Sequence, residues 1–158
     1  MVNIKVVAVG KIKESFHKEQ INEYLKRLSR YTKISIIEVE EAKTKDESLS
    51  SINNALIKEG ENILKQIKEN EYLILLDLHG NDMNSEDFAK KMDQVISLGK
   101  SIVFAIGGSY GLSDEVRKRS NFSLKLSKMT FTHQMTRIII LEQVYRSFKI
   151  NNNETYHK

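Results

Sequence analysis

Residues 72–78, YLILLDL, and residues 101–106, SIVFAI, are near-continuous apolar runs in the middle of the chain. Runs of this length without polar alternation are typical of parallel strands that are buried on both faces of a sheet. Outward from them, strand patterns also occur at residues 3–9, 33–39 and 122–127. We therefore predict that these five stretches form a mainly parallel sheet.

Helical patterns separate the predicted strands. Each has apolar residues at helical spacing or begins at a residue that caps helices well. The predicted helices cover residues 14–31, a segment from the serines at 48–51 to about residue 70, residues 85–98, a short segment from Ser113, and residues 133–150. Alternating strands and helices predict an α/β fold, a mainly parallel sheet flanked by helices. Because no repeat or linker interrupts the pattern, we expect residues 1–158 to form a single domain.

Composition excludes several classes of protein. The chain has 158 residues, 40% of them hydrophobic and 29% charged, which suits one globular domain and excludes a disordered polymer. It has no cysteine, and its four histidines are scattered, so we expect no disulfide and no metal site. No apolar run approaches the roughly 20 residues of a membrane span, and no secretory signal opens the chain. A cytoplasmic protein without membrane contact is expected.

Positive charge is concentrated in the C-terminal third. Residues 117–149 contain eight basic residues and one acidic residue, although the net charge of the whole chain is only +4. Such a distribution suggests an anionic partner, with nucleic acid the leading candidate. The alternative is a set of solvated lysines and arginines without a partner.

Small and polar residues follow three of the predicted strands: HGND at 79–82, GGSYG at 107–111 and SKMTFT at 127–132. The carboxyl ends of parallel strands share one edge of a sheet, so we expect these segments to form one ligand-binding rim. None matches the dinucleotide or Walker A signatures, and GSYG after a strand is only a weak match to a KH clamp. At 127–132, the alternatives are a simple helix cap and a pocket that stacks a flat base.

The last helix and the tail carry two further hypotheses. The apolar arc of the helix, with Ile138 and Leu141 at its centre, is wide enough to suggest either deep burial or a homodimer. Opposite it, Glu142 and Arg146 form either a surface ion pair or a ribose or phosphate site. The tail ends in Tyr156, His157 and Lys158, which combine a stacking ring, an imidazole and a cation suited to RNA.

Taken together, five motifs identify a resemblance. They are the first strand followed by Gly-Lys, LILLDLHG, FAIGGSYGLSDEV, LSKMTFTHQMTRIIILEQVYRSFKI and the terminal Tyr-His-Lys. The chain resembles, over its full length, the RlmH (YbeA-like) family of SPOUT methyltransferases. This resemblance implies a homodimer that uses S-adenosylmethionine to methylate N3 of a pseudouridine in 23S rRNA, on the assembled 70S ribosome. It also implies a SPOUT-type fold with a C-terminal trefoil knot.

The resemblance implies a cofactor pocket, carried over by motif, and the rim pattern adds one glycine to it. The expected cofactor-binding residues are Leu76, Gly107, Gly108, Ser127, Lys128, Met129, Thr130, Phe131 and Thr132. For catalysis, a base must remove the imide proton of the pseudouridine. His157, reaching across a dimer interface, is our first candidate and His133 the second.

Three other residues complete the expected site. We expect Tyr156 to stack on the base, and Arg146, with Glu142, to hold a phosphate or ribose.

We expect His79 either to line the pocket or to lie in a turn, and His17 to lie on the surface outside the site. Two other functions stay open: a non-catalytic RNA-binding module, which would bind RNA without the cofactor, and a small-molecule nucleotide-binding α/β enzyme, which would do the reverse.

Overall fold

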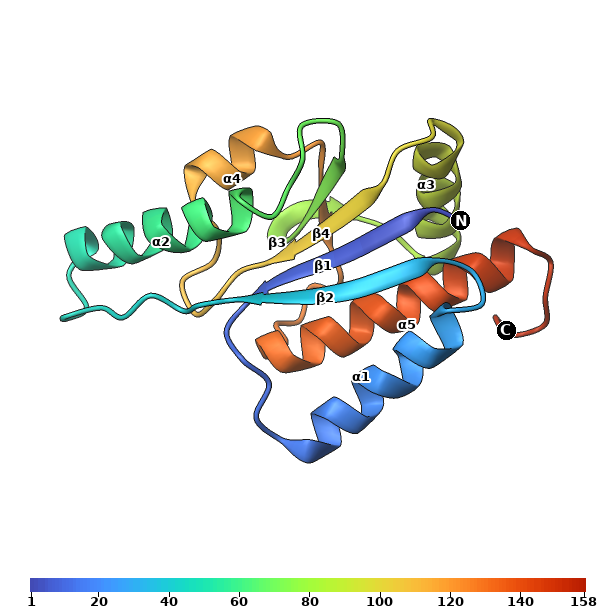
Figure 1. Ribbon diagram of the computed structural model, residues 1–158, viewed down its shortest axis with the longest axis horizontal. Helices are drawn as coiled ribbons and strands as arrows, with labels where there is room; N and C mark the ends of the chain where they lie inside the picture. Colours follow the sequence, from blue (N-terminus) through green and yellow to red (C-terminus); the bar gives the residue numbers. More distant parts are fainter.

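A computed structural model describes all 158 residues as one parallel sheet of five strands with five helices (Figure 1). The strand order is β2-β1-β4-β3-β5, and every neighbouring pair is parallel. The strands are β1 Asn3–Val9, β2 Lys33–Val39, β3 Tyr72–Asp82, β4 Ile102–Ile106 and β5 Phe122–Lys125. The helices are α1 Ser15–Leu28, α2 Leu49–Leu64, α3 Ser85–Ser97, α4 Asp114–Arg119 and α5 His133–Asn151. The predicted α/β class with a parallel sheet is confirmed.

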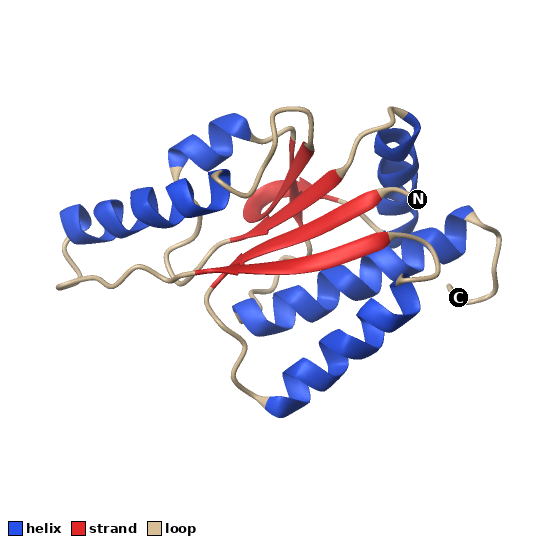
Figure 2. Cartoon of the chain, viewed as in Figure 1, coloured by secondary structure: helices blue, strands red, loops and turns tan.

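Helices cover both faces of the sheet in three layers (Figure 2). Helices α1, α3 and α5 pack on one face and form the larger core, whereas α2 and α4 cover the other. Successive strand residues alternate between these cores: Val6 and Ala8 face α5, and Val7 and Val9 face α2 and α4. This double burial explains why the central strands are continuous apolar runs.

The wide apolar arc of α5 is buried within one chain. Ile138, Ile140, Leu141, Val144 and Phe148 all belong to the larger core, between the sheet, α1 and α3. Of the two explanations that the sequence left open, deep burial therefore accounts for the arc. The width of the arc alone does not require a second copy of the chain.

Strand β3 is longer than predicted. Residues 79–82, expected as a rim loop, continue the strand after a register shift, and Asn81 and Asp82 pair with Leu124 and Lys125 of β5. Gly80 is needed for this close pairing, because a Cβ there would lie 2.8 Å from the backbone of β5. His79 is exposed and lies on this extension, so the prediction of three rim loops was wrong for the first of them.

Some helix boundaries also differ from the prediction. Helix α1 ends at Leu28 rather than at residue 31, and α2 ends at Leu64 rather than near residue 70. None of the five helices combines the length and apolar character that crossing a bilayer requires. The trefoil knot stays a prediction of the resemblance.

Helix α2 packs closely on α4 through a glycine. A Cβ added at Gly60 would lie 2.2 Å from Oγ of Ser113, the hydroxyl that accepts from the amide of Val116 and caps α4. Here two effects oppose each other. Alanine in place of glycine stabilises a helix interior by about 1 kcal/mol, but an overpacked contact costs about 1–3 kcal/mol.

We expect the steric effect to dominate, so that Gly60→Ala lowers the free energy of unfolding by about 1–2 kcal/mol. Urea denaturation measures this change. Asn53→Ala, at an exposed site on the same helix, is the matched control and should be neutral or slightly stabilising. A gain in stability from Gly60→Ala would show that α4 moves away at no cost.

Candidate functional site

A cavity of about 240 Å³ lies at the carboxyl ends of β3, β4 and β5. Parallel α/β sheets place their ligands at this edge. Residues from the end of β3, the loop after β4, the loop after β5, α4 and the first turn of α5 surround it. They are Leu76, Asp77, Leu78, Ile106, Gly107, Gly108, Ser109, Gly111, Leu112, Arg117, Leu124, Lys125, Leu126, Ser127, Met129, Thr130, Phe131, His133 and Thr136. We call this the rim cavity.

Most of the residues predicted to bind a cofactor line the rim cavity. Those that do are Leu76, Gly107, Gly108, Ser127, Met129, Thr130 and Phe131. Lys128 is exposed and does not line it. Thr132 does not line it either, because its hydroxyl accepts a hydrogen bond from the amide of Met135 at 3.2 Å and caps α5. The predicted helix cap is therefore Thr132, and whether the neighbouring residues that line the cavity bind a flat base stays a prediction.

The loop after β4 needs its glycines. The amide of Gly111 donates to the carbonyl of Gly108 at 3.1 Å, and these two residues form an isolated bridge. A Cβ at Gly107 would lie 2.4 Å from the Gly111 carbonyl oxygen, and Gly111 has a φ of +90°. The loop therefore brings backbone, rather than side chains, to the edge of the cavity.

A buried carboxylate in the rim cavity was missed by the sequence reasoning. Asp77 lies in the middle of β3, where its pairing with β5 shifts register, and its side chain is only 9% exposed and forms an ion pair with Arg117 of α4. The signal was present: Asp77 is the single charged residue in the run YLILLDL. A charge in a buried strand requires a partner, and such residues are frequently functional.

Behind the glycine loop lies a buried glutamate. Glu59 of α2 is only 5% exposed and accepts a hydrogen bond from the amide of Ala42 at 2.9 Å. Burial raises the pKa of Glu59, and the carboxylate of Glu41 raises it further, against the effect of the Ala42 amide. A Cβ at Gly108 would lie 3.4 Å from Oε1 of Glu59, so the Glu59 carboxyl group lies directly behind the loop.

The mouth of the rim cavity is apolar and exposed. Leu78 is 53% exposed, Met129 75% and Phe131 38%. Met135, the third residue of α5, is also 41% exposed, although it does not line the cavity. Exposed apolar side chains gathered at a cavity are typical of a surface that another molecule covers.

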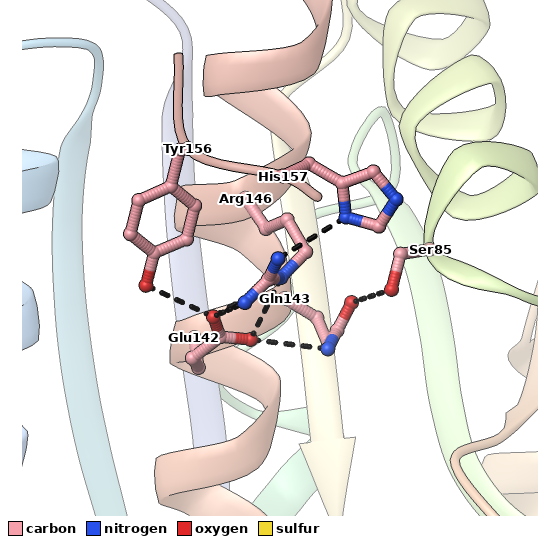
Figure 3. Close-up of polar contacts among 6 residues, drawn as sticks. All are labelled: Ser85, Glu142, Gln143, Arg146, Tyr156 and His157. Carbon is pink, nitrogen blue, oxygen red and sulfur yellow. Dashed lines mark hydrogen bonds and ion pairs between the residues drawn. The ribbon is translucent and has the colours of Figure 1, made fainter.

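The tail folds back onto α5 instead of fraying. Tyr156 donates from its hydroxyl to Oε1 of Glu142 at 3.1 Å, and Arg146 donates to the same carboxylate at 2.7 Å (Figure 3). The guanidinium of Arg146 also lies 4.7 Å from the centre of the Tyr156 ring. Gln143 joins Glu142 to Ser85 at the start of α3. We call these residues, with His157 and Glu86, the tail cluster.

Two pKa shifts follow from the tail cluster. Burial, together with the hydrogen bond to the Glu142 carboxylate, raises the pKa of the Tyr156 phenol. The hydrogen bonds to Glu142 raise the pKa of Arg146. Tyr156 is therefore a hydrogen-bond donor at neutral pH and not a base.

Both ring nitrogens of His157 have partners. Nδ1 lies 3.1 Å from Nη1 of Arg146, and Nε2 lies 2.7 Å from Oε1 of Glu86. A guanidinium only donates hydrogen bonds, so Nδ1 accepts and the proton of the neutral ring is on Nε2. In this arrangement His157 has no free lone pair for a substrate.

The rim cavity and the tail cluster lie at separate places along α5. His133 lines the rim cavity, whereas Arg146 is 13 positions further, roughly 20 Å along a helix that rises 1.5 Å per residue. His157 lines a separate cavity of about 370 Å³. This cavity shares only three lining residues with the rim cavity, Leu124, Lys125 and Leu126. Within one chain, the structure thus brings His133 to the rim cavity and leaves Tyr156, Arg146 and Glu142 outside it. Lys158 is exposed. No group of three or more His, Cys, Asp or Glu side chains is arranged to hold a metal ion.

Comparison with known proteins shows the family of the chain. The model of the family described as "Predicted SPOUT methyltransferase" matches residues 2–157. The chain is 51% identical over 160 residues to ribosomal RNA large subunit methyltransferase H of Acetivibrio thermocellus, covering 99% of this chain and 100% of that protein. The proteins of the same name from Clostridium kluyveri and Clostridium botulinum are 50% and 51% identical over 159 residues, with the same coverage. The chain belongs to the SPOUT methyltransferase family.

Proposed function

We propose that this protein transfers a methyl group from S-adenosylmethionine to N3 of a pseudouridine in 23S rRNA, with the assembled 70S ribosome as substrate. The observation that carries this proposal is the glycine-walled rim cavity, in a chain whose full-length relatives are named ribosomal RNA large subunit methyltransferase H. Ribosomal RNA as the substrate implies that the protein acts in the cytoplasm.

The residues of the rim cavity suit the proposed cofactor. Leu76, Ile106 and Leu126 provide apolar walls for a flat adenine ring. The loops at 107–109 and 127–130 bring backbone amides and carbonyls to its edge, which provide directional hydrogen bonds. Asp77 provides a carboxylate for ribose hydroxyls or for a positive charge, although Arg117 already neutralises much of it.

S-adenosylmethionine supplies a methyl group that is already activated by its positive sulfur. The protein must therefore hold the target nitrogen in line with that methyl group and accept the proton of the imide. Under this proposal, His157 accepts the proton at Nδ1. Since Nδ1 accepts from Arg146 in the chain as it stands, an RNA phosphate that binds Arg146 would free Nδ1 for the base.

The other tail residues have binding roles. The raised pKa of Tyr156 keeps its phenol protonated, so the ring can stack on a base while the hydroxyl stays on Glu142. Arg146 and Lys158 provide positive charge for the backbone phosphates. Further basic residues between 117 and 149 extend this charge over the C-terminal third.

We propose a homodimer in which the tail cluster of one chain completes the rim cavity of the other. The distance along α5 supports this arrangement, because a single chain keeps His157 away from the cavity that His133 lines. The exposed apolar mouth formed by Leu78, Met129 and Phe131 is the surface that a second chain and the RNA would cover.

The reaction is tested with labelled methyl groups. Ribosomes from a strain lacking this gene, incubated with the protein and labelled S-adenosylmethionine, should take up label at one large-subunit pseudouridine. Deproteinised rRNA should take up little. Label on neither substrate, with the cofactor still bound, would exclude this target; RNA binding without cofactor binding would favour the non-catalytic module.

The cofactor site is tested by Gly107→Ala. We expect the affinity for S-adenosylmethionine, measured by calorimetry, to fall about tenfold or more. The new methyl group would push residues 107 and 111 apart and so distort the loop that walls the cavity. Asn53→Ala, far from the cavity on α2, should bind the cofactor normally. Unchanged affinity in Gly107→Ala would place the cofactor elsewhere.

The composite site is tested by mixing two inactive variants. Gly107→Ala weakens cofactor binding, so it is nearly inactive when S-adenosylmethionine is kept well below the dissociation constant of this variant. His157→Ala removes the proposed base while leaving cofactor binding intact. Co-expressed in equal amounts, they should recover about one quarter of the wild-type activity, because half the dimers are mixed and each of these has one complete site. If both groups act within one chain, the mixture will recover no activity. If His133 is the base and the tail is dispensable, His157→Ala will be active alone.

A further inference from the structure

A second cavity lies beside the rim cavity, with a volume of about 260 Å³. Gly108 and His133 line both, so the two are direct neighbours. Its walls come from the end of β1 and the loop after it, the first turns of α1 and α5, one residue after β2 and one after β4. They are Val9, Gly10, Lys11, Lys13, Glu14, His17, Glu41, Gly108, His133, Gln134 and Arg137. We call it the helix-end cavity.

Two helices begin at this cavity. The N-terminal ends of α1 and α5 lie on the same side of the molecule, next to the carboxyl ends of β1 and β2 (Figure 1). The first amides of a helix have no partner within the helix and carry partial positive charge. At α1 the cap residue Glu14 makes no side-chain hydrogen bond to them. The first turns of two helices therefore line one cavity, and only α5 has a side-chain cap, the Thr132 hydroxyl that accepts from the amide of Met135.

Buried side chains at the cavity lack partners as well. Arg137 is only 2% exposed; its Nη1 donates to Glu38 at 2.5 Å and its Nη2 to the carbonyl of Gly10 at 2.8 Å, but its Nε has no partner. Nδ1 of His17 also lacks a partner, although His17 itself is partly exposed and does not line the rim cavity. Both atoms are closed to solvent, so a ligand oxygen would give them the hydrogen bond they lack only after these side chains shift toward the cavity.

The charges favour an anion. Lys11 and Lys13 at the mouth carry free positive charge, and Arg137 adds its own beside Glu38. Two exposed carboxylates oppose them, Glu14 and Glu41, and the second accepts a hydrogen bond from Ser109 at 3.4 Å. The unpartnered groups are nevertheless mostly donors. A phosphate, which has several acceptor oxygens and no donor, matches that set.

We propose that the helix-end cavity binds a backbone phosphate of the RNA next to the methylated nucleotide. This inference rests on the proposed function, in which the cofactor occupies the rim cavity. Because Gly108 and His133 line both cavities, the phosphate would bind directly beside the cofactor site. Binding of the RNA backbone at this point would hold the neighbouring base at the mouth of the rim cavity.

Gln134→Glu is the most informative variant. Gln134 lines the helix-end cavity but not the rim cavity, and a carboxylate in the first turn of α5 is favourable for the helix itself. The variant should therefore fold normally and bind S-adenosylmethionine with unchanged affinity. We expect its affinity for 70S ribosomes to fall about tenfold through repulsion of the phosphate.

Lys13→Gln provides an independent measurement. Losing one phosphate contact should make the plot of log affinity against log salt less steep by about one. The matched control is Lys100→Gln, an exposed lysine after α3 that lines none of these cavities. If Lys13→Gln and Gln134→Glu behave like this control, the proposal is overturned.

Inorganic phosphate separates this proposal from the proposed function. In the wild-type protein, phosphate should shift the NMR signals of the His17 and Gln134 amides, and in Gln134→Glu it should not. That result would support the site even if no methyl transfer to ribosomes were found. Absence of any phosphate-dependent shift at these amides would overturn the site, whatever the enzyme methylates.

Discussion

The hydrogen bonds of the buried Arg137 guanidinium fix the position of the start of α5, which lines both cavities. They tie the first turns of α5 to the carboxyl edge of the sheet, through Glu38 at the end of β2 and the carbonyl of Gly10 after β1. Burial alone would raise the pKa of Glu38, but the hydrogen bonds from Arg137 and from the Ile12 amide hold it below its usual range. A buried charge is tolerated only with such partners. With α5 anchored here, His133 is held between the two cavities.

Much of the fold was predictable because its strands are buried on both faces. Continuous apolar runs and helical spacing predicted every element, and the errors fall where tertiary contacts decide. Gly80 was expected in a rim loop, yet it lies in β3 and allows β5 to approach the extended end of that strand. That approach depends on a register shift between strands distant in sequence, which no local pattern encodes. Gly60 is a parallel case, since its small size serves the contact with Ser113 of α4.

The site was predictable only as far as topology determines it. Strand ends in a parallel sheet share one edge, so the glycine loop and the segment 127–131 could be placed there from sequence. The sequence did not show which side chains of these segments line the cavity: Lys128 lies outside it. Asp77 stands out in the sequence as the one charge in a buried strand, but its partner, Arg117 of α4, does not. The tail shows the same limit. Its residue types suggested RNA chemistry, but its anchor on Glu142 depends on a fold-back that composition does not reveal.

The tail cluster couples substrate binding to base chemistry under the proposed function. Arg146 contacts Glu142, the Tyr156 ring and Nδ1 of His157 at once. A phosphate that draws Arg146 away would free the one lone pair of His157 that can accept a proton, while Tyr156 keeps its hydrogen bond to Glu142. The imidazole would then become a base only when RNA is present. Such a site would favour a substrate that places a phosphate at Arg146 and a base at Nδ1 of His157 at the same time, and an rRNA loop held in its folded shape by the ribosome can do both.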